Sequence, residues 1–142
     1  MKKKAVLSIV VACVALMLCA ALVGCNGANN TTQSSSSRQA LLKFVEVNQS
    51  AVDSMKENYS ALYSDLGLRA EGDNVLIYFY IFKDQMDPEA AAQALAANSG
   101  SLDAAKDTLL GGLRDTGVKD PIVKYQYYNS DGKTLIWEYV IE

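Results

Sequence analysis

The stretch VLIYFYIF, residues 75–82, contains only β-branched, aliphatic and aromatic residues, and it decides the fold. A short apolar run of this composition predicts a buried strand. The turn sequence EGDN precedes it at residues 71–74, and before that turn Leu66, Leu68 and Ala70 alternate with polar residues. The sequence therefore predicts a first β-hairpin in this region.

A second hairpin is predicted close to the end of the chain. Residues 122–128 and 134–141 have strand composition, and the turn sequence NSDG lies between them. Gly132 can adopt the positive φ that such a turn requires.

The remaining segments show helical periodicity. Apolar residues recur at intervals of three, four and seven over residues 41–66, and a kink is expected near Asn48. Asp87 followed by proline predicts a helix start, with the helix running to about residue 98. A third helix is expected to be capped by Ser101 and closed by Gly117.

The expected order of elements is α-β-β-α-α-β-β. Because hairpins pair locally and helices need a sheet face to cover, we predict an α+β fold. Its architecture is a two-layer sandwich, with a four-stranded antiparallel sheet made from two hairpins and packed on helices. The strand order is left open.

The first 25 residues resemble the export signal of a bacterial lipoprotein. Three lysines at positions 2–4 precede the uncharged stretch 5–23, and Leu22-Val23-Gly24-Cys25 resembles a lipobox. This predicts a signal peptide at residues 1–24 and a lipidated Cys25 that carries fatty-acyl chains such as palmitate. A polar, flexible tether completes residues 25–37 and a single domain occupies residues 38–142. The alternative is an uncleaved N-terminal anchor.

The expected mature chain has a simple redox and charge character. Cys13 and Cys19 lie inside the predicted signal peptide, so no disulfide is expected. Removing the three lysines leaves ten basic and sixteen acidic residues, a formal charge of −6. An acidic domain is a poor partner for nucleic acid, which we therefore exclude.

The residue types present argue against an enzyme. The chain has no histidine, which excludes serine–histidine and cysteine–histidine catalysis and the common zinc sites. Neighbouring carboxylates such as Asp103 and Asp107 fit a solvated helix face. We predict no catalytic residue, no cofactor and no metal.

A calcium loop is the closest approach to a metal motif. Asn129, Asp131, Gly132 and Glu138 match positions three, five, six and twelve of an EF-hand loop. Tyr127 occupies position one, however, where an aspartate is expected. Ordinary turn chemistry explains the same residues more simply.

Tyrosines supply the best candidate for a binding site. Six of the eight tyrosines lie in predicted strands, and helices can cover only one face of a two-layer fold. If Val123 and Tyr125 point inward, the uncovered face carries Glu138 and the candidate binding residues Tyr78, Tyr80, Lys124, Gln126 and Tyr128. Such a face suits a peptide, a glycan or a protein. The alternatives are ordinary cross-strand tyrosine pairs or self-association.

Several segments together resemble a family of uncharacterised small lipoproteins from Gram-positive gut bacteria. The segments are the lipobox, the polar tether, FVEVNQSAVDSM, EGDNVLIYFYIF and YYNSDGKTLIWEYVI. The resemblance implies an envelope location and an α+β layout, and it brings no catalytic residues.

Taken together, these features predict a lipoprotein anchored in the cell membrane, with a small binding domain on the extracytoplasmic side. Its partners would be the membrane and an envelope protein, peptide or glycan. The alternatives are an accessory or inhibitor domain acting on an extracellular hydrolase, through residues 83–88 or 129–132, or an enzyme without histidine.

Overall fold

The computed structural model describes residues 33–142. The predicted signal peptide, Cys25 and the first part of the predicted tether lie outside the described residues. Along the described chain the elements are α2 (Gln33–Val47), α3 (Gln49–Asn58), β1 (Tyr63–Glu71), β2 (Val75–Phe82), α4 (Pro88–Ala96), α5 (Gly100–Asp115), β3 (Ile122–Tyr128) and β4 (Leu135–Ile141). None of the helices within residues 33–142 is long and apolar enough to span a membrane.

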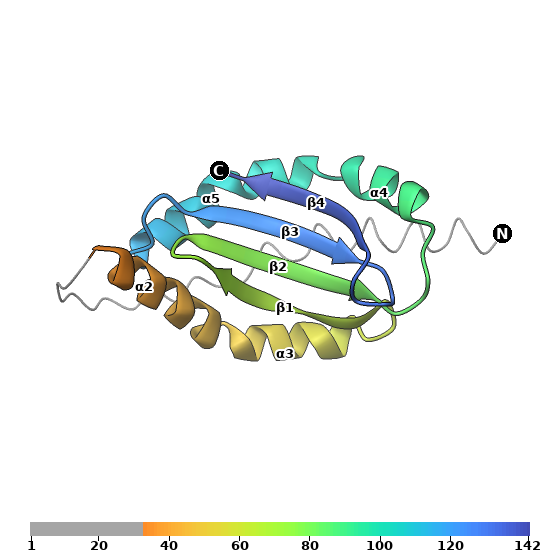
Figure 1. Ribbon diagram of the computed structural model, residues 1–142, viewed down its shortest axis with the longest axis horizontal. Helices are drawn as coiled ribbons and strands as arrows, with labels where there is room; N and C mark the ends of the chain where they lie inside the picture. Colours follow the sequence, from red (N-terminus) through yellow and green to blue (C-terminus); the bar gives the residue numbers. More distant parts are fainter. Residues whose placement is uncertain (1–32) are drawn as a thin grey trace.

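The four strands form one sheet in the order β1-β2-β3-β4 (Figure 1). Both predicted hairpins are present as antiparallel pairs, and the α+β class is confirmed. The prediction of a wholly antiparallel sheet is wrong, because β2 and β3 pair in parallel. Residues 83–121, with α4 and α5, connect these two strands, and a long crossover of this kind permits parallel neighbours.

The predicted first helix is two helices, so the order is α-α-β-β-α-α-β-β. The break lies at Asn48, as expected; Asn48 is the residue before α3, and its side chain makes no capping hydrogen bond to that helix. Its side-chain Nδ2 donates to the Phe44 carbonyl at 2.8 Å, one turn back in α2. A side chain that competes for backbone groups in this way favours a helix end.

The first described helix begins before residue 38. Helix α2 starts at Gln33, and Ser37 is buried. The Ser37 hydroxyl donates to the Asp73 carbonyl at 2.9 Å and accepts from the Lys119 amide at 3.0 Å. It therefore joins α2 to the β1–β2 turn and to the segment before β3.

Of the two helix starts predicted after β2, the structure confirms that of α4 and not that of α5. Asp87 caps α4, and its Oδ1 accepts from the Ala90 amide at 2.9 Å. Ser101 is not the cap of α5, which begins at Gly100; its hydroxyl donates instead to the Asn98 carbonyl at 3.1 Å.

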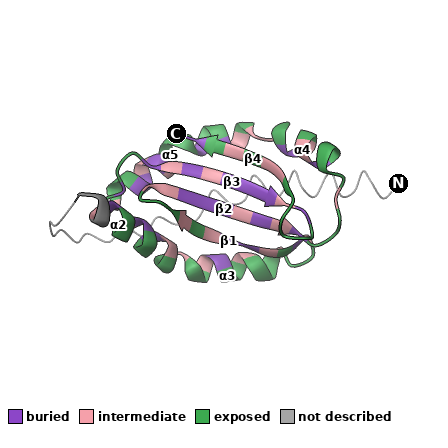
Figure 2. Ribbon diagram, in the orientation of Figure 1, coloured by how far each residue is buried: buried purple, intermediate pink, exposed green. Residues whose placement is uncertain are grey.

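All described helices contribute to a single core on one face of the sheet. Helices α2 and α3 contact β1, α5 contacts β3 and α4 contacts β4. In Figure 1, α2 and α3 flank the β1 side, and α5 runs behind β3 and β4. Figure 2 shows buried residues concentrated in β2 and β3. The helix residues of the core are Leu41, Phe44, Val52, Leu95, Leu102, Leu110 and Leu113.

The prediction that Tyr78 and Tyr80 lie on the uncovered face is wrong. They belong to the core, with exposed fractions of 5% and 2%. Tyr78 stacks on Tyr125 at a centroid distance of 4.8 Å, and Tyr80 stacks on Tyr127 at 4.6 Å. The cross-strand tyrosine pairs that the sequence left as an alternative therefore form beneath the helices.

Candidate functional site

The other face of the sheet is covered by none of the described helices, and we call it the open face. The pairing register places on it Arg69 of β1, Ile77, Phe79 and Ile81 of β2, Lys124, Gln126 and Tyr128 of β3, and Glu138 and Val140 of β4. Lys124, Gln126, Tyr128 and Glu138 are thus on the face where the sequence analysis placed them. Arg69 and Phe79 were not predicted.

A hydrogen-bonded group at the centre of this face, the Gln126 cluster, consists of Arg69, Gln126, Tyr128 and Glu138. Gln126 is 9% exposed, and its Oε1 accepts from Arg69 at 3.0 Å and from the Tyr128 hydroxyl at 2.9 Å. Its Nε2 donates to Glu138 Oε2 at 2.6 Å. Side chains from three strands are therefore held in one arrangement. Both amide atoms of buried Gln126 are hydrogen-bonded, and a buried polar group satisfied in this way holds its neighbours in place.

An aromatic platform adjoins the Gln126 cluster. The Phe79 ring lies over Gly67 so closely that a Cβ at residue 67 would be 2.9 Å from the ring. The Arg69 guanidinium lies 5.9 Å from the centre of the same ring, within cation–π range. Gly67 thus leaves room for the ring against β1, and Arg69 connects the platform to Gln126.

Charged side chains of both signs lie within the Gln126 cluster and beside it. Lys124 Nζ lies 3.5 Å from Glu71 Oε2, while Arg69 and Glu138 are exposed. Val140 is 42% exposed at the β4 side. The arrangement offers planar polar groups, an aromatic ring and both charges, which suits recognition of a polar partner rather than a purely apolar one.

The tyrosines beneath the helices have a different electrostatic character. Burial raises the pKa of Tyr78 to about 12, and it also raises the pKa values of Tyr80 and Tyr125 above the ordinary value. Tyr139, at the β4 edge, donates to Asp103 of α5, and this hydrogen bond raises the Tyr139 pKa. These phenols remain neutral at physiological pH and serve as packing groups.

The turn that resembled a calcium loop uses its side chains on its own backbone. Asp131 accepts from the Lys133 and Thr134 amides and from the Thr134 hydroxyl. These hydrogen bonds, that of the hydroxyl above all, lower the Asp131 pKa to about 2. Within residues 33–142 no group of three or more metal-ligating side chains occurs. The geometry at Asp131 is that of a turn.

Buried Asn129 joins this turn to the segment that follows β2. Its Nδ2 donates to the Met86 carbonyl at 3.0 Å, and its Oδ1 accepts from the Met86 amide at 2.9 Å. The Ser130 hydroxyl also donates to Gln85 Oε1 at 2.8 Å. Residues 83–88 and 129–132, the two loops proposed for an inhibitor, are thus hydrogen-bonded to each other.

Of the two residues that were not predicted, only Arg69 had a signal in the sequence. Arg69 stands between Leu68 and Ala70, in the alternation that predicted the first strand. No such signal exists in β2, because both of its faces are apolar.

Comparisons with known proteins place most of the described chain in one family. Residues 40–138 match the model of the family described as "Domain of unknown function (DUF4854)". No curated protein and no solved structure matches the chain.

Proposed function

The chain belongs to the DUF4854 family, a domain of unknown function, and on this premise we propose that it is a membrane-anchored, extracytoplasmic binding module. The Gln126 cluster on the open face is the observation that supports this proposal. An envelope protein, a peptide or a glycan is the partner class that the cluster fits. The lipobox ending at Cys25 supports the anchoring.

The side chains of the open face are already ordered before any partner binds, which favours this face as the binding site. Binding is weakened when long side chains must be ordered, at about 0.5–1.5 kcal/mol for each. Arg69, Tyr128 and Glu138 are already held by Gln126, so this cost is largely met in the free protein. Phe79 and Tyr128 add aromatic surface for stacking or apolar contact.

The anchoring is tested by metabolic labelling with a palmitate analogue and by membrane fractionation. The parent chain is expected to be labelled and to sediment with membranes. Cys25→Ser removes the acceptor thiol and should abolish labelling. Labelling of the Cys25→Ser variant would overturn the assignment of Cys25.

The binding face is tested by photo-crosslinking of the full chain in intact cells. A benzoylphenylalanine placed at Tyr128 is an aromatic replacement on the open face, and one at exposed Lys106 of α5 is the matched control on the helix side. A discrete adduct is expected from position 128 only. It should disappear when Phe79→Ala is added. Equal adducts from both positions, or none from position 128, would contradict the proposal.

The joined loops favour an inhibitor domain as a second candidate. Protease inhibitors bind with little change of shape, which requires loops that are rigid beforehand. Asn129, with five hydrogen bonds to four neighbouring residues, supplies this rigidity. Photo-crosslinking from exposed Gln85, with none from Tyr128, would select this alternative.

A further inference from the structure

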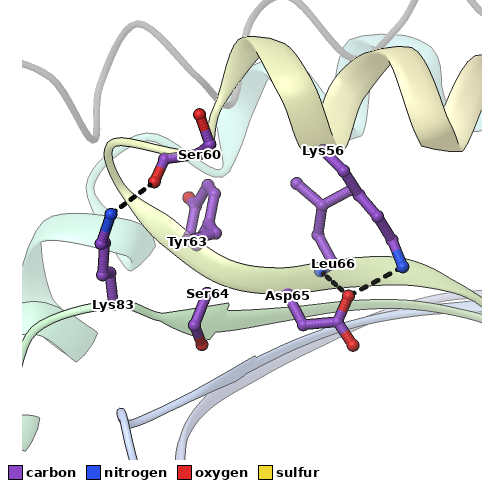
Figure 3. Close-up of a pocket in the computed structure, with 7 residues that line it drawn as sticks. All are labelled: Lys56, Ser60, Tyr63, Ser64, Asp65, Leu66 and Lys83. Atoms are coloured by element: carbon purple, nitrogen blue, oxygen red, sulfur yellow. Dashed lines mark hydrogen bonds and ion pairs between the residues drawn. The ribbon is translucent and has the colours of Figure 1, made fainter.

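A pocket of about 370 Å³ opens at the β1 edge of the domain (Figure 3). Its walls come from the last turn of α3, the α3–β1 connection, the first residues of β1 and the residue that follows β2. Tyr63 lies in the middle of the view, with Lys83 on one side and Lys56 on the other. The pocket shares no residue with the Gln126 cluster.

An irregularity in β1 shapes this pocket. Tyr63 pairs with Phe82 and Asp65 pairs with Ile81, so Ser64 is an extra residue between two consecutive pairs. A bulge of this kind bends a strand and redirects its side chains, and bulges are frequent next to functional sites. Here Tyr63, Ser64 and Asp65 all reach the pocket wall.

Lys83 is a positioned cation. Its Nζ donates to the Ser60 carbonyl at 3.1 Å, which uses one of its three N–H groups. Among residues 33–142 no carboxylate lies within 4 Å of this ammonium. Two donors and a full positive charge therefore remain for a ligand.

The second lysine is balanced by an acid. Lys56 Nζ lies 2.8 Å from Asp65 Oδ1, which also accepts from the Leu66 amide at 2.9 Å. Both contacts use Oδ1, so Asp65 Oδ2 is available to accept from a ligand hydroxyl.

The resulting charge selects the ligand class. Two lysines and one aspartate give the pocket a net charge of +1, whereas the ten basic and sixteen acidic residues of the described chain sum to −6. A positively charged site on an acidic domain fits a single negative charge.

We propose that this pocket binds a small monoanion that carries hydroxyl groups. Its carboxylate or phosphodiester oxygens accept from Lys83, and a hydroxyl donates to Asp65. The site is separate from the open face and does not depend on the proposed binding of a macromolecule there.

The test is a titration of the isotope-labelled full chain in neutral detergent, followed by the amide NMR signals of Ser64, Asp65 and Lys83. The probes are glycerate, a carboxylate, and glycerophosphoglycerol, a phosphodiester, at constant ionic strength. Acetate lacks the hydroxyls and glycerol lacks the charge. Saturable shifts are expected with at least one of the first two probes, weaker binding with acetate and none with glycerol. The stronger probe identifies the anionic group.

Two variants distinguish binding in this pocket from non-specific attraction of anions to lysines on the surface. Lys83→Gln keeps a donor for the Ser60 carbonyl and removes the charge, and it should weaken binding roughly tenfold or more. Lys106→Gln removes the same charge from α5 and should leave binding unchanged. Absence of saturable shifts with both anions, equal affinity of the Lys83→Gln variant, or equal losses in both variants would overturn the proposal. If glycerate binds saturably, an equal affinity for acetate would overturn the role of Asp65.

Discussion

The two faces of the sheet are built from the same strands but on different principles. The covered face of β2 and β3 is a set of stacked rings, in which Tyr78 and Tyr80 contact Tyr125 and Tyr127. The open face is organised around Gln126, whose partners are polar and partly exposed. Apolar character therefore did not decide which face of β2 is inside, because both faces of β2 are apolar. The helices cover the face whose larger rings fill the space beneath them.

The largest difference between the faces is expected in stability. Tyr80 is 2% exposed and contacts the rings of Tyr63 and Tyr127, so Tyr80→Ala should lower the free energy of unfolding by about 3–5 kcal/mol. Tyr128→Ala, on the open face, should cost about 1 kcal/mol or less. Urea unfolding measures both. Similar losses for the two variants would show that the faces contribute alike.

Alkaline pH should also act on the covered face. Burial raises the pKa of Tyr78 in the folded state from the ordinary value of 10.0 to about 12, so the native state holds this proton more strongly than the unfolded state does. The stability is therefore fully present below about pH 10 and is lost as the pH rises through about 12, by about 2–3 kcal/mol from this residue. Urea midpoints across this range measure the loss.

Tyr78→Phe is the control for that titration. It removes the ionisable group and keeps the ring, so stability should fall less steeply above pH 10. Equal pH dependence of the parent and the variant would contradict the assignment to Tyr78.

On the open face, a substitution at Gly67 should lower the free energy of unfolding by a smaller amount, and only while the Phe79 ring is present. Gly67→Ala places a Cβ 2.9 Å from the Phe79 ring, and the displaced ring should cost about 1–2 kcal/mol. In a Phe79→Ala background the same change should be neutral or slightly stabilising, since alanine restricts the unfolded chain more than glycine does. A double-mutant cycle measures the coupling. Additive effects would mean that the ring does not lie on Gly67.

Much of the fold could be predicted from the sequence because its signals are local. Turn residues at 71–74 and 129–132 predicted both hairpins, and Asp87 with Pro88 predicted the start of α4. The parallel pairing of β2 and β3 could not be predicted, because it depends on how the crossover returns to the sheet. Ser37 could not be assigned to the domain either, because its partners Asp73 and Lys119 are distant in sequence.

The part of the candidate site on β3 could be predicted from the sequence, whereas the part on β2 could not. Lys124 and Gln126 alternate with apolar residues, and this polarity fixed the orientation of β3. β2 has no polar residue to fix its own orientation, so the sequence did not determine which of its two apolar faces points toward the helices. Tyr78 and Tyr80 were therefore predicted on the uncovered face, although they lie in the core. A single lysine or glutamine in β2 would have removed the ambiguity.

The smallest effect on stability is expected for Gln126, which holds the other side chains of the Gln126 cluster in place. Gln126→Met keeps the volume and removes the hydrogen bonds, while exposed Arg69 and Glu138 can turn to water. The free energy of unfolding should therefore change by less than about 1 kcal/mol. Crosslinking from position 128 should nevertheless fall severalfold, because Arg69 and Glu138 lose their common partner. A loss of several kcal/mol with crosslinking intact would instead make the Gln126 cluster a structural element, equivalent to the tyrosine stacks on the other side of the sheet.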